Sequence, residues 1–221
     1  GGKQMKKILF ILLFGSLCLF TSCNNDRSFE EKTYTLSSSE SVFIEELSVD
    51  CFDREIKLEG NDEETISVTY FEDDQETYAF TIEDQTLSIV LSQHKNWYDF
   101  IGVKADRQYR TVTISLPDRL FKTLKIETTN ENLTVSSLKA ETVELINNGG
   151  NILLHDLKAD YLSATIKNGH ITGNIQGSWD QYEISCTVKK GNSNLPEYKS
   201  GGPNQMKIEA NNGDIDLTIE P

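Results

Sequence analysis

Apolar and polar residues alternate along this chain from Tyr34 onward with the period of two that is typical of β-strands. Turn-forming clusters of glycine, asparagine and acidic residues separate the alternating segments. No segment of this region has a convincing helical period. The pattern predicts antiparallel strands for residues 33–120, with alternating apolar residues at Val42/Ile44, Ile66/Val68/Tyr70, Tyr78/Phe80/Ile82, Leu87/Ile89/Leu91 and Val112/Ile114/Leu116.

The second half of the chain repeats a short turn that places a polar residue before an apolar one. Asn132, Asn151, His170, Asn192 and Asp214 occupy the polar position, at successive separations of 19, 19, 22 and 22 residues. A self-similar period of this length is typical of a stacked solenoid. We therefore expect an all-β fold in which the antiparallel region continues into a short β-solenoid of about five coils at residues 121–221, packed with it as one unit.

The repeat unit is clearest where residues 124–140 align without gaps on residues 143–159. Each unit contains two apolar pairs and a lone leucine, such as Val143/Leu145, Ile152/Leu154 and Leu157. A coil with these pairs facing inward would bury them along a common axis. A leucine-rich repeat is the competing architecture, but several of its obligatory leucine positions are not filled.

The N-terminus has the pattern of a bacterial lipoprotein signal peptide. A basic segment (Lys6, Lys7) and an apolar run that ends at Leu19 precede Cys23. The apolar run is shorter than the roughly 20 residues that a transmembrane helix needs. We expect residues 1–22 to be a leader with an upstream extension, Cys23 to carry the lipid, and residues 23–32 to be a short tether. The protein would then be anchored to the cell membrane, facing outside the cytoplasm.

The chain is strongly acidic. Its 221 residues contain 35 Asp and Glu against 21 Lys and Arg, a net charge of −14, and removal of the leader leaves −17. This charge repels phosphate backbones, so we expect no nucleic-acid partner. Two acidic runs, at residues 59–64 and 72–76, lack the spacing of a calcium loop and are predicted to be solvated turns.

Two cysteines remain outside the leader and the proposed anchor. Cys51 and Cys186 both occupy inward positions of alternating segments. Buried free thiols are the simpler interpretation, and a long-range disulfide is the alternative in an oxidising environment. Two cysteines without matched histidines cannot complete a zinc site, and we expect no metal and no cofactor.

Several of these segments resemble the putative adhesin family of unknown function, which is allied to the head GIN domains of autotransporter-like adhesins. The similarity covers roughly Val42 to the C-terminus. It depends on Ile56-Lys-Leu-Glu-Gly60, Val112-Thr-Ile-Ser-Leu-Pro117 and the coils Asn168-Gly-His-Ile171 and Asn212-Gly-Asp-Ile215. The resemblance implies a β-rich, solenoid-like envelope protein without established catalytic residues. Glu131 departs from it, because glycine is usual at that position.

No known catalytic motif is present in the sequence, and we expect the protein not to be an enzyme. One polar cluster at a predicted corner contains His155, Asp156, Lys158 and Asp160. General acid or base catalysis would need two of these groups to converge on one groove. A solvated corner is the favoured interpretation, and His170 is interpreted as a turn residue.

The candidate ligand-binding residues are Trp97, Tyr98 and Phe100, which interrupt the strand alternation in a predicted loop. Such side chains can stack on sugar rings or anchor a protein interface. Alternatively, they cover the junction between the two regions. Trp179 and Tyr182 are predicted to pack over the end of a coil.

Three functional classes follow. The first is a surface-exposed adhesion or binding module for a glycan or an envelope protein. The second is an envelope sensor or regulatory lipoprotein that contacts a membrane protein. The third, a glycan-cleaving enzyme, is the least favoured. The sequence does not indicate an oligomeric state.

Overall fold

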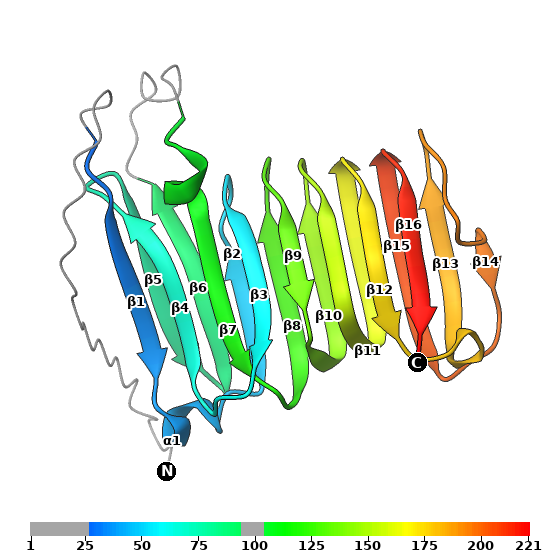
Figure 1. Cartoon of the computed structure of the whole chain (residues 1–221), viewed down its shortest axis with the longest axis horizontal. Coiled ribbons are helices and arrows are strands. Elements are labelled where there is room, and N and C mark those ends of the chain that lie inside the picture. Colours follow the sequence, from blue (N-terminus) through cyan, green and yellow to red (C-terminus); the bar gives the residue numbers. More distant parts are fainter. Residues whose placement is uncertain (1–26, 94–103) are drawn as a thin grey trace, which may run out of the picture.

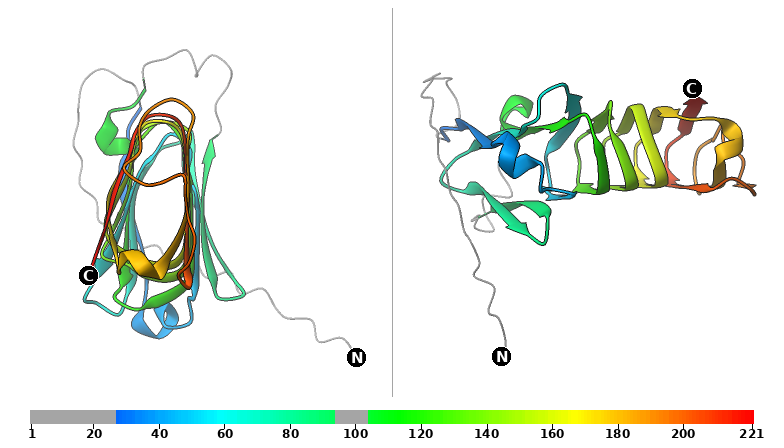
Figure 2. Two further views of the ribbon diagram at one scale, coloured as in Figure 1. Left: turned by 90° about the vertical axis from the view of Figure 1, so that its right-hand side faces the viewer. Right: turned by 90° about the horizontal axis from the view of Figure 1, so that it is seen from below.

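The protein is an elongated, almost entirely β solenoid (Figure 1). The computed structural model describes residues 27–93 and 104–221. Seen along its length, the solenoid has a narrow, flattened cross-section formed by two long sides and two tight bends (Figure 2). The predicted all-β, solenoid-like fold is confirmed.

Short turns connect strands that differ widely in length. The described elements are β1 (Glu30–Leu36), α1 (Ser38–Ser41), β2 (Glu46–Asp50), β3 (Glu55–Asn61), β4 (Ile66–Glu72), β5 (Glu76–Glu83), β6 (Thr86–Gln93), η2 (Arg107–Arg110), β7 (Thr111–Pro117), β8 (Leu120–Thr128), β9 (Leu133–Ser136), β10 (Lys139–Asn147), β11 (Ile152–Asn168), β12 (Ile171–Gln176), η3 (Trp179–Gln181), β13 (Tyr182–Val188), β14 (Tyr198–Lys199), β15 (Asn204–Asn212) and β16 (Ile215–Glu220).

The two long sides form a front and a back sheet, named as they lie in Figure 1. The front sheet has the order β1-β4-β7-β3-β9-β11-β12-β16, and the back sheet has the order β5-β6-β2-β8-β10-β11-β15-β13-β14. The 17-residue strand β11 belongs to both, because its first part pairs with β9 and β12 and its second part with β10 and β15.

The 19-residue sequence repeat equals the sequence separation between residues that are paired on neighbouring coils. In the back sheet Val143 is paired in parallel with Leu124 on one side and with Leu162 on the other, each 19 residues away. Leu145 lies in the same way between Ile126 and Ala164. Equivalent residues of successive repeats therefore stack directly above one another.

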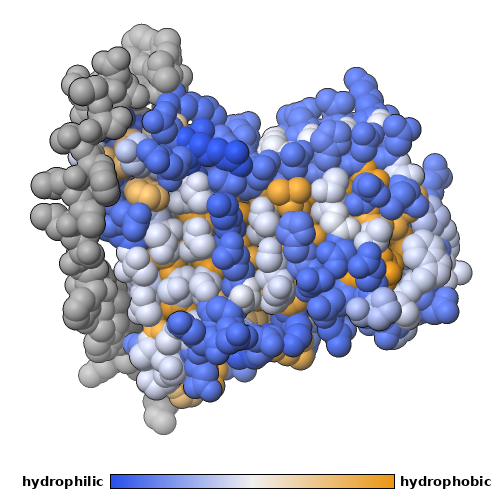
Figure 3. Space-filling view, viewed as in Figure 1, coloured by the Kyte–Doolittle hydropathy of each residue, from blue (hydrophilic) through white to orange (hydrophobic). Residues whose placement is uncertain are grey.

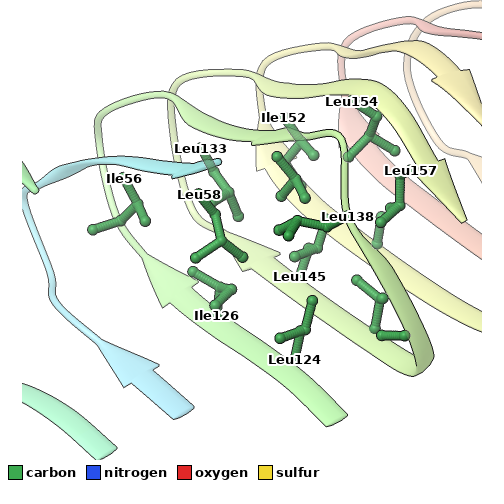
Figure 4. Packing of buried hydrophobic residues seen from close by; sticks show 14 of the residues in the cluster. Ile56, Leu58, Leu124, Ile126, Leu133, Leu138, Leu145, Ile152, Leu154 and Leu157 are labelled. Atoms are coloured by element: carbon green, nitrogen blue, oxygen red, sulfur yellow. The ribbon is translucent and has the colours of Figure 1, made fainter. Parts of the chain in front are cut away.

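The stacked inward pairs form one continuous core. Ile56, Leu58, Ile126, Leu133 and Leu145 are 0 or 1% exposed and pack from both sheets into the space between them (Figure 4). Complete burial of a side chain of this size stabilises the fold by about 1.5–3 kcal/mol. The core runs from β1 to β16 without a break.

The last two coils do not stack in sequence order. Strand β15 pairs with β11 on one side and with β13 on the other. The coil of β15 and β16 is therefore inserted between the coil of β11 and β12 and the coil that begins with β13, although β13 comes earlier in the sequence. The turn after β13 carries Ser193 where other coils have leucine or isoleucine, and Pro196 follows it. This segment makes only one bridge to the front sheet, between Ser193 and Ile215. A polar strand with a proline suits the end of a stack and not its interior, because proline donates no backbone hydrogen bond.

The N-terminal region mixes parallel and antiparallel pairing. The predicted antiparallel pairing is found for β1 with β4, β4 with β7, and β5 with β6. However, β2 pairs in parallel with β6 and β8, and β3 pairs in parallel with β7 and β9. Alternation identifies the buried face of a strand but not its direction, and the parallel coils therefore begin earlier than predicted.

A layer of aromatic side chains closes the N-terminal end of the core. Tyr34 stacks on Phe80 with ring centroids 4.3 Å apart, and Tyr70 contacts Tyr78 and Phe80 at 4.8 and 5.1 Å. Residues 27–32, predicted as tether, belong to the folded body: Arg27 pairs with Asp73 and Glu76, and β1 begins at Glu30. Among the described residues no helix has the length and hydrophobicity to span a membrane.

Candidate binding surfaces

The residues that the sequence singled out most strongly lie outside the described part of the chain. These are the proposed lipid anchor Cys23 and the aromatic residues Trp97, Tyr98 and Phe100. Their assignments therefore stay predictions.

The repeated polar turn residues form a ladder of hydrogen-bond acceptors along one bend. Asn132 Oδ1 accepts from the backbone N–H of Asn151 at 3.0 Å, and Asn151 Oδ1 accepts from that of His170 at 2.9 Å. His170 Nδ1 then accepts from the N–H of Asp214 at 3.0 Å, and Asp214 Oδ1 from that of Asn192 at 2.8 Å. Each side chain therefore satisfies a turn amide of the next coil. The interpretation of His170 as a turn residue is confirmed.

The glycines beside this ladder are required by close backbone contact. An added Cβ at Gly169 would lie 1.7 Å from the carbonyl oxygen of Gly150, and one at Gly213 would lie 1.8 Å from that of Gly169. Both glycines also have positive φ angles, of 136° and 143°. Glu131 replaces glycine at the N-terminal end of this stack, where Arg110 binds its carboxylate and the positive φ moves to Asn130.

We expect Gly213→Ala to lower the free energy of unfolding by on the order of 3 kcal/mol, because it adds a backbone clash to an unfavourable φ. Gly201→Ala is the matched control. Gly201 also has a positive φ, of 87°, but no atom lies within 4 Å of its added Cβ. Denaturant unfolding of both variants measures the difference, and equal losses would show that the stack does not require glycine.

The predicted polar corner is solvated. His155, Asp156, Lys158 and Asp160 are all exposed on β11. Asp156 accepts a hydrogen bond from Asn174 Nδ2 at 2.7 Å and has a φ of 52°, so it serves the bend. A shallow hollow of about 180 Å³ lies beside it. The hollow is lined by Gly60, Asn61, Asp62, Asp118, Ser137, Lys139, Asp156 and Gln176. Lys139 is already paired with Asp118 at 2.8 Å, so the hollow offers no free cation to an anionic ligand.

One of the two acidic runs is not a solvated turn. Asp62, Glu63 and Glu64 of the first run are exposed, as predicted. In the second run, by contrast, the side chains of Asp73 and Glu76 are only 1 and 2% exposed. Composition could not indicate this, because the basic partners come from distant parts of the chain.

The basic partners of Glu76 are Arg27 and Arg54, whose guanidinium nitrogens lie 2.9 and 2.8 Å from its carboxylate, and Gln93 Nε2 also donates to this carboxylate at 2.8 Å. Arg54 also donates to the hydroxyl of Tyr78 at 2.8 Å and to the carbonyl of Asp53 at 3.0 Å. Burial acts to lower the pKa of Arg54, but Tyr78 and Glu76 outweigh it and hold the pKa above its ordinary value. Burial likewise raises the pKa of the Tyr78 hydroxyl. These groups form a structural network at the N-terminal end of the core.

Both remaining cysteines are buried free thiols. Burial raises the pKa of Cys51 to about 12, so its thiol is protonated and unreactive at neutral pH. Cys51 follows β2 and Cys186 lies in β13, five strand spacings apart in the back sheet, or about 24 Å. A disulfide within one chain cannot span this distance.

The two aromatic residues of the last coil have different roles. Tyr182 is fully buried, and its hydroxyl donates to the carbonyl oxygens of Ala159 and Gln176 at 3.1 and 3.2 Å. It packs over the coil, as predicted. Trp179 is 45% exposed, with Lys199 Nζ 5.6 Å from its ring centroid.

The outer face of the front sheet carries a field of hydroxyl groups. Along β1, β4 and β7, every second side chain faces outward, and those of Thr33, Thr35, Ser67, Thr69, Thr113 and Ser115 form two rows. Figure 3 shows these strands as a pale area over the left half of the front sheet, between more polar margins. Beyond β7 the row that contains Thr113 is interrupted by Lys57 of β3 and Leu153 of β11, with Thr134 between them and Thr172 after them. A Thr/Ser alternation within an apolar run is the sequence signal for this face.

Half of the six hydroxyls on β1, β4 and β7 have another side chain as a hydrogen-bond partner. Thr33 and Thr69 approach each other at 3.5 Å, and Ser115 accepts from Asn61. The hydroxyls of Thr35, Ser67 and Thr113 make no side-chain hydrogen bond to any residue in the described ranges. In a chain of net charge −14, the field is an uncharged surface with free donors and acceptors.

In the described ranges, no three His, Cys, Asp or Glu side chains are grouped to hold a metal ion. The solenoid therefore offers outer surfaces for contact, in which short polar side chains cover a closely packed core.

The chain has a similar fold to a solved structure and matches a known sequence family. The fold is similar to the crystal structure of a putative cell adhesion protein from Clostridium sporogenes ATCC 15579, with a TM-score of 0.57 and 14% identity over 88% of this chain and 100% of that one. A putative adhesin from Bacteroides fragilis NCTC 9343 matches with a TM-score of 0.33 and 13% identity over 86 and 97% of the two chains. No curated protein sequence matches the chain. Residues 44–220 match the Toastrack domain DUF4097, and the chain therefore belongs to the Toastrack DUF4097 family.

Proposed function

We propose that this protein is a non-catalytic binding protein of the bacterial envelope, anchored by a lipid on Cys23 and exposed outside the cytoplasm. The observation that carries the proposal is the flat hydroxyl field on the front sheet, held over a continuous core. Membership of the Toastrack family and the structural similarity to a putative cell adhesion protein support it. The leader pattern before Cys23 supports the anchor.

The hydroxyl field suits a large and flat partner. Strands in a sheet lie about 4.8 Å apart, so the rows offer a donor and acceptor at regular intervals. Binding to such a surface would depend on many weak hydrogen bonds, each worth about 0.5–1.5 kcal/mol. A polysaccharide or an envelope protein can supply a matching set of polar groups.

A second candidate function, a regulatory lipoprotein that contacts a membrane protein, is favoured by the position of Arg27. Cys23 precedes Arg27 by four residues, which span at most about 14 Å. Arg27 is fixed to Asp73 and Glu76 at the N-terminal end of the solenoid. A lipid on Cys23 would thus hold this end close to the membrane, within reach of an integral membrane partner.

The test uses cells that produce the full chain. We expect the wild-type protein to fractionate with membranes. Where the anchored protein faces the outside of the cell, protease added to intact cells should cleave it. The Cys23→Ala variant should be released from the membrane fraction. Binding to isolated envelope polysaccharide and to solubilised membrane proteins is then measured with the purified mature chain.

Paired arginine variants locate the contact surface. Thr69→Arg with Thr113→Arg places two charges on adjacent strands of the hydroxyl field. Thr123→Arg with Thr142→Arg makes the same change on adjacent strands of the back sheet. Loss of binding in the first pair alone supports the proposal. Capture of one membrane protein, with no polysaccharide retained, would favour the regulatory function. Retention of Cys23→Ala in the membrane fraction would contradict the lipid anchor.

A further inference from the structure

A second hollow lies on the opposite face, near the C-terminal end of the solenoid. Its volume is about 170 Å³. It is lined by Tyr161 of β11, Gln205, Met206 and Lys207 of β15, and Glu183 and Ser185 of β13. The hollow depends on the insertion of β15, because this strand brings the other two to either side of it.

The strand register explains how these side chains converge. Tyr161, Gln205 and Glu183 are direct neighbours across β11, β15 and β13, and Lys207 is the neighbour of Ser185 in the next outward row. Met206 alternates with them and is buried beneath. In the same row as Ser185 lies Tyr198 of β14, which is 64% exposed. Tyrosine side chains therefore lie on both sides of the shorter polar ones.

The polar groups of the hollow are available for a ligand. The hydroxyl of Tyr161, the amide of Gln205, the carboxylate of Glu183 and the hydroxyl of Ser185 make no side-chain hydrogen bond or ion pair with other residues of ranges 27–93 and 104–221. Lys207 pairs only with Glu209, at 2.9 Å and in an exposed position. The set contains donors and acceptors, and because Glu209 already balances the charge of Lys207, the carboxylate of Glu183 disfavours an anionic ligand.

We propose that this hollow binds one neutral sugar residue of a longer glycan. Sugar hydroxyls both donate and accept hydrogen bonds, as this mixed set requires, and the phenol ring of Tyr161 offers an apolar face to the C–H side of a sugar ring. The hollow is smaller than the roughly 300–1,000 Å³ of a typical small-molecule pocket, so it suits a single ring. It is open at the surface, which leaves room for the chain on either side.

The location adds to the argument. The strands that line the hollow, β11, β15 and β13, lie toward the end of the solenoid that is opposite to β1 (Figure 1). Its biological role therefore depends on the proposed function, because a lipid at Cys23 would place this end farther from the membrane than the N-terminal end. The chemistry of the hollow does not depend on the anchor.

The experiment measures binding of the purified mature chain to immobilised neutral oligosaccharides built from hexose and N-acetylhexosamine units, with sialylated and sulfated oligosaccharides beside them. We expect saturable binding of a neutral oligosaccharide, and a loss of roughly tenfold or more in affinity for Tyr161→Ala and for Gln205→Ala. Gln205 is exposed, so its truncation leaves the core intact even if the Tyr161 variant is destabilised. Thermal unfolding confirms that each variant is folded.

Glu183→Gln and Glu144→Gln form the matched pair. Both glutamates face outward from the back sheet, but only Glu183 lines the hollow. We expect a clear loss of affinity for the first and no change for the second. Failure of the wild-type chain to bind neutral oligosaccharides, preference for the acidic ones, or equal behaviour of the two variants would overturn the proposal. The Tyr161, Gln205 and Glu183 variants should lose affinity for the sugar while they still fractionate with membranes. This outcome separates the sugar site from the proposed lipid anchor.

Discussion

Glu76→Gln is expected to lower the free energy of unfolding by about 3–5 kcal/mol, because it leaves a buried cation without its anion. Arg54 is 1% exposed, and its Nη2 lies 2.8 Å from the carboxylate of Glu76. Arginine does not lose its proton in a protein, so Arg54 cannot relieve the loss by becoming neutral. Glutamine keeps the size of the side chain, and the effect therefore reports the charge and not a cavity.

Glu46→Gln is the control for this measurement. Glu46 pairs with Lys122 at 2.9 Å, but the two side chains are 28 and 59% exposed. Exposed pairs contribute at most about 1 kcal/mol. Denaturant unfolding followed by circular dichroism compares the two variants. A loss below 1 kcal/mol for Glu76→Gln would mean that the network at the N-terminal end contributes specificity of packing but little stability.

Ending the chain after Pro203 is expected to unfold more of the protein than it removes. The deleted residues include β15 and β16, whose Met206, Ile208, Ile215 and Leu217 are 0 to 2% exposed. Their burial contributes on the order of 8 kcal/mol. Because β13 pairs with β15 along its length and otherwise only with the two-residue β14, β13 loses its main partner as well. Coils that contact only their nearest neighbours, from β2 to β12, stay folded.

Hydrogen exchange measured peptide by peptide checks this expectation. Peptides from residues 182–199 should lose protection in the truncated chain, while those from residues 120–147, whose partners remain, keep it. A chain that lacks only Glu220 and Pro221 serves as the control and should resemble the wild type. If residues 182–199 stay protected after truncation at Pro203, the coil of β13 is held by contacts other than β15.

The sequence predicted the periodic features of the fold well and the order of its parts poorly. The gapless 19-residue alignment of residues 124–140 on 143–159 is the register of the coils. The order of the last coils could not be read from the same pattern, because inward pairs such as Ile184/Cys186 and Met206/Ile208 fit either position. Ser193 and Pro196 are the residues that carried the missing information, since neither suits an interior strand.

The candidate sites illustrate a related limit. Alternation showed which side chains face outward, yet the hydroxyl field and the second hollow arise from strands that the chain order does not place side by side. Strand β4 precedes β7 by two other strands, and β15 follows β11 by three. The burial of Glu76 likewise depends on Arg27 and Arg54, which are 49 and 22 residues away. The proposed roles of Trp97, Tyr98, Phe100 and Cys23 depend on sequence alone.

The insertion of β15 between β11 and β13 also bears on how the chain is made. Coils near the N-terminus can stack in the order in which the ribosome releases them, but β13 has no partner along its length until β15 has been synthesised. A prematurely terminated product would therefore expose the unpaired edges of β11 and β12, which invite aggregation. Pairing of β15 therefore protects both of its neighbours, and a product that lacks it presents β13 as an unpaired, protease-sensitive segment.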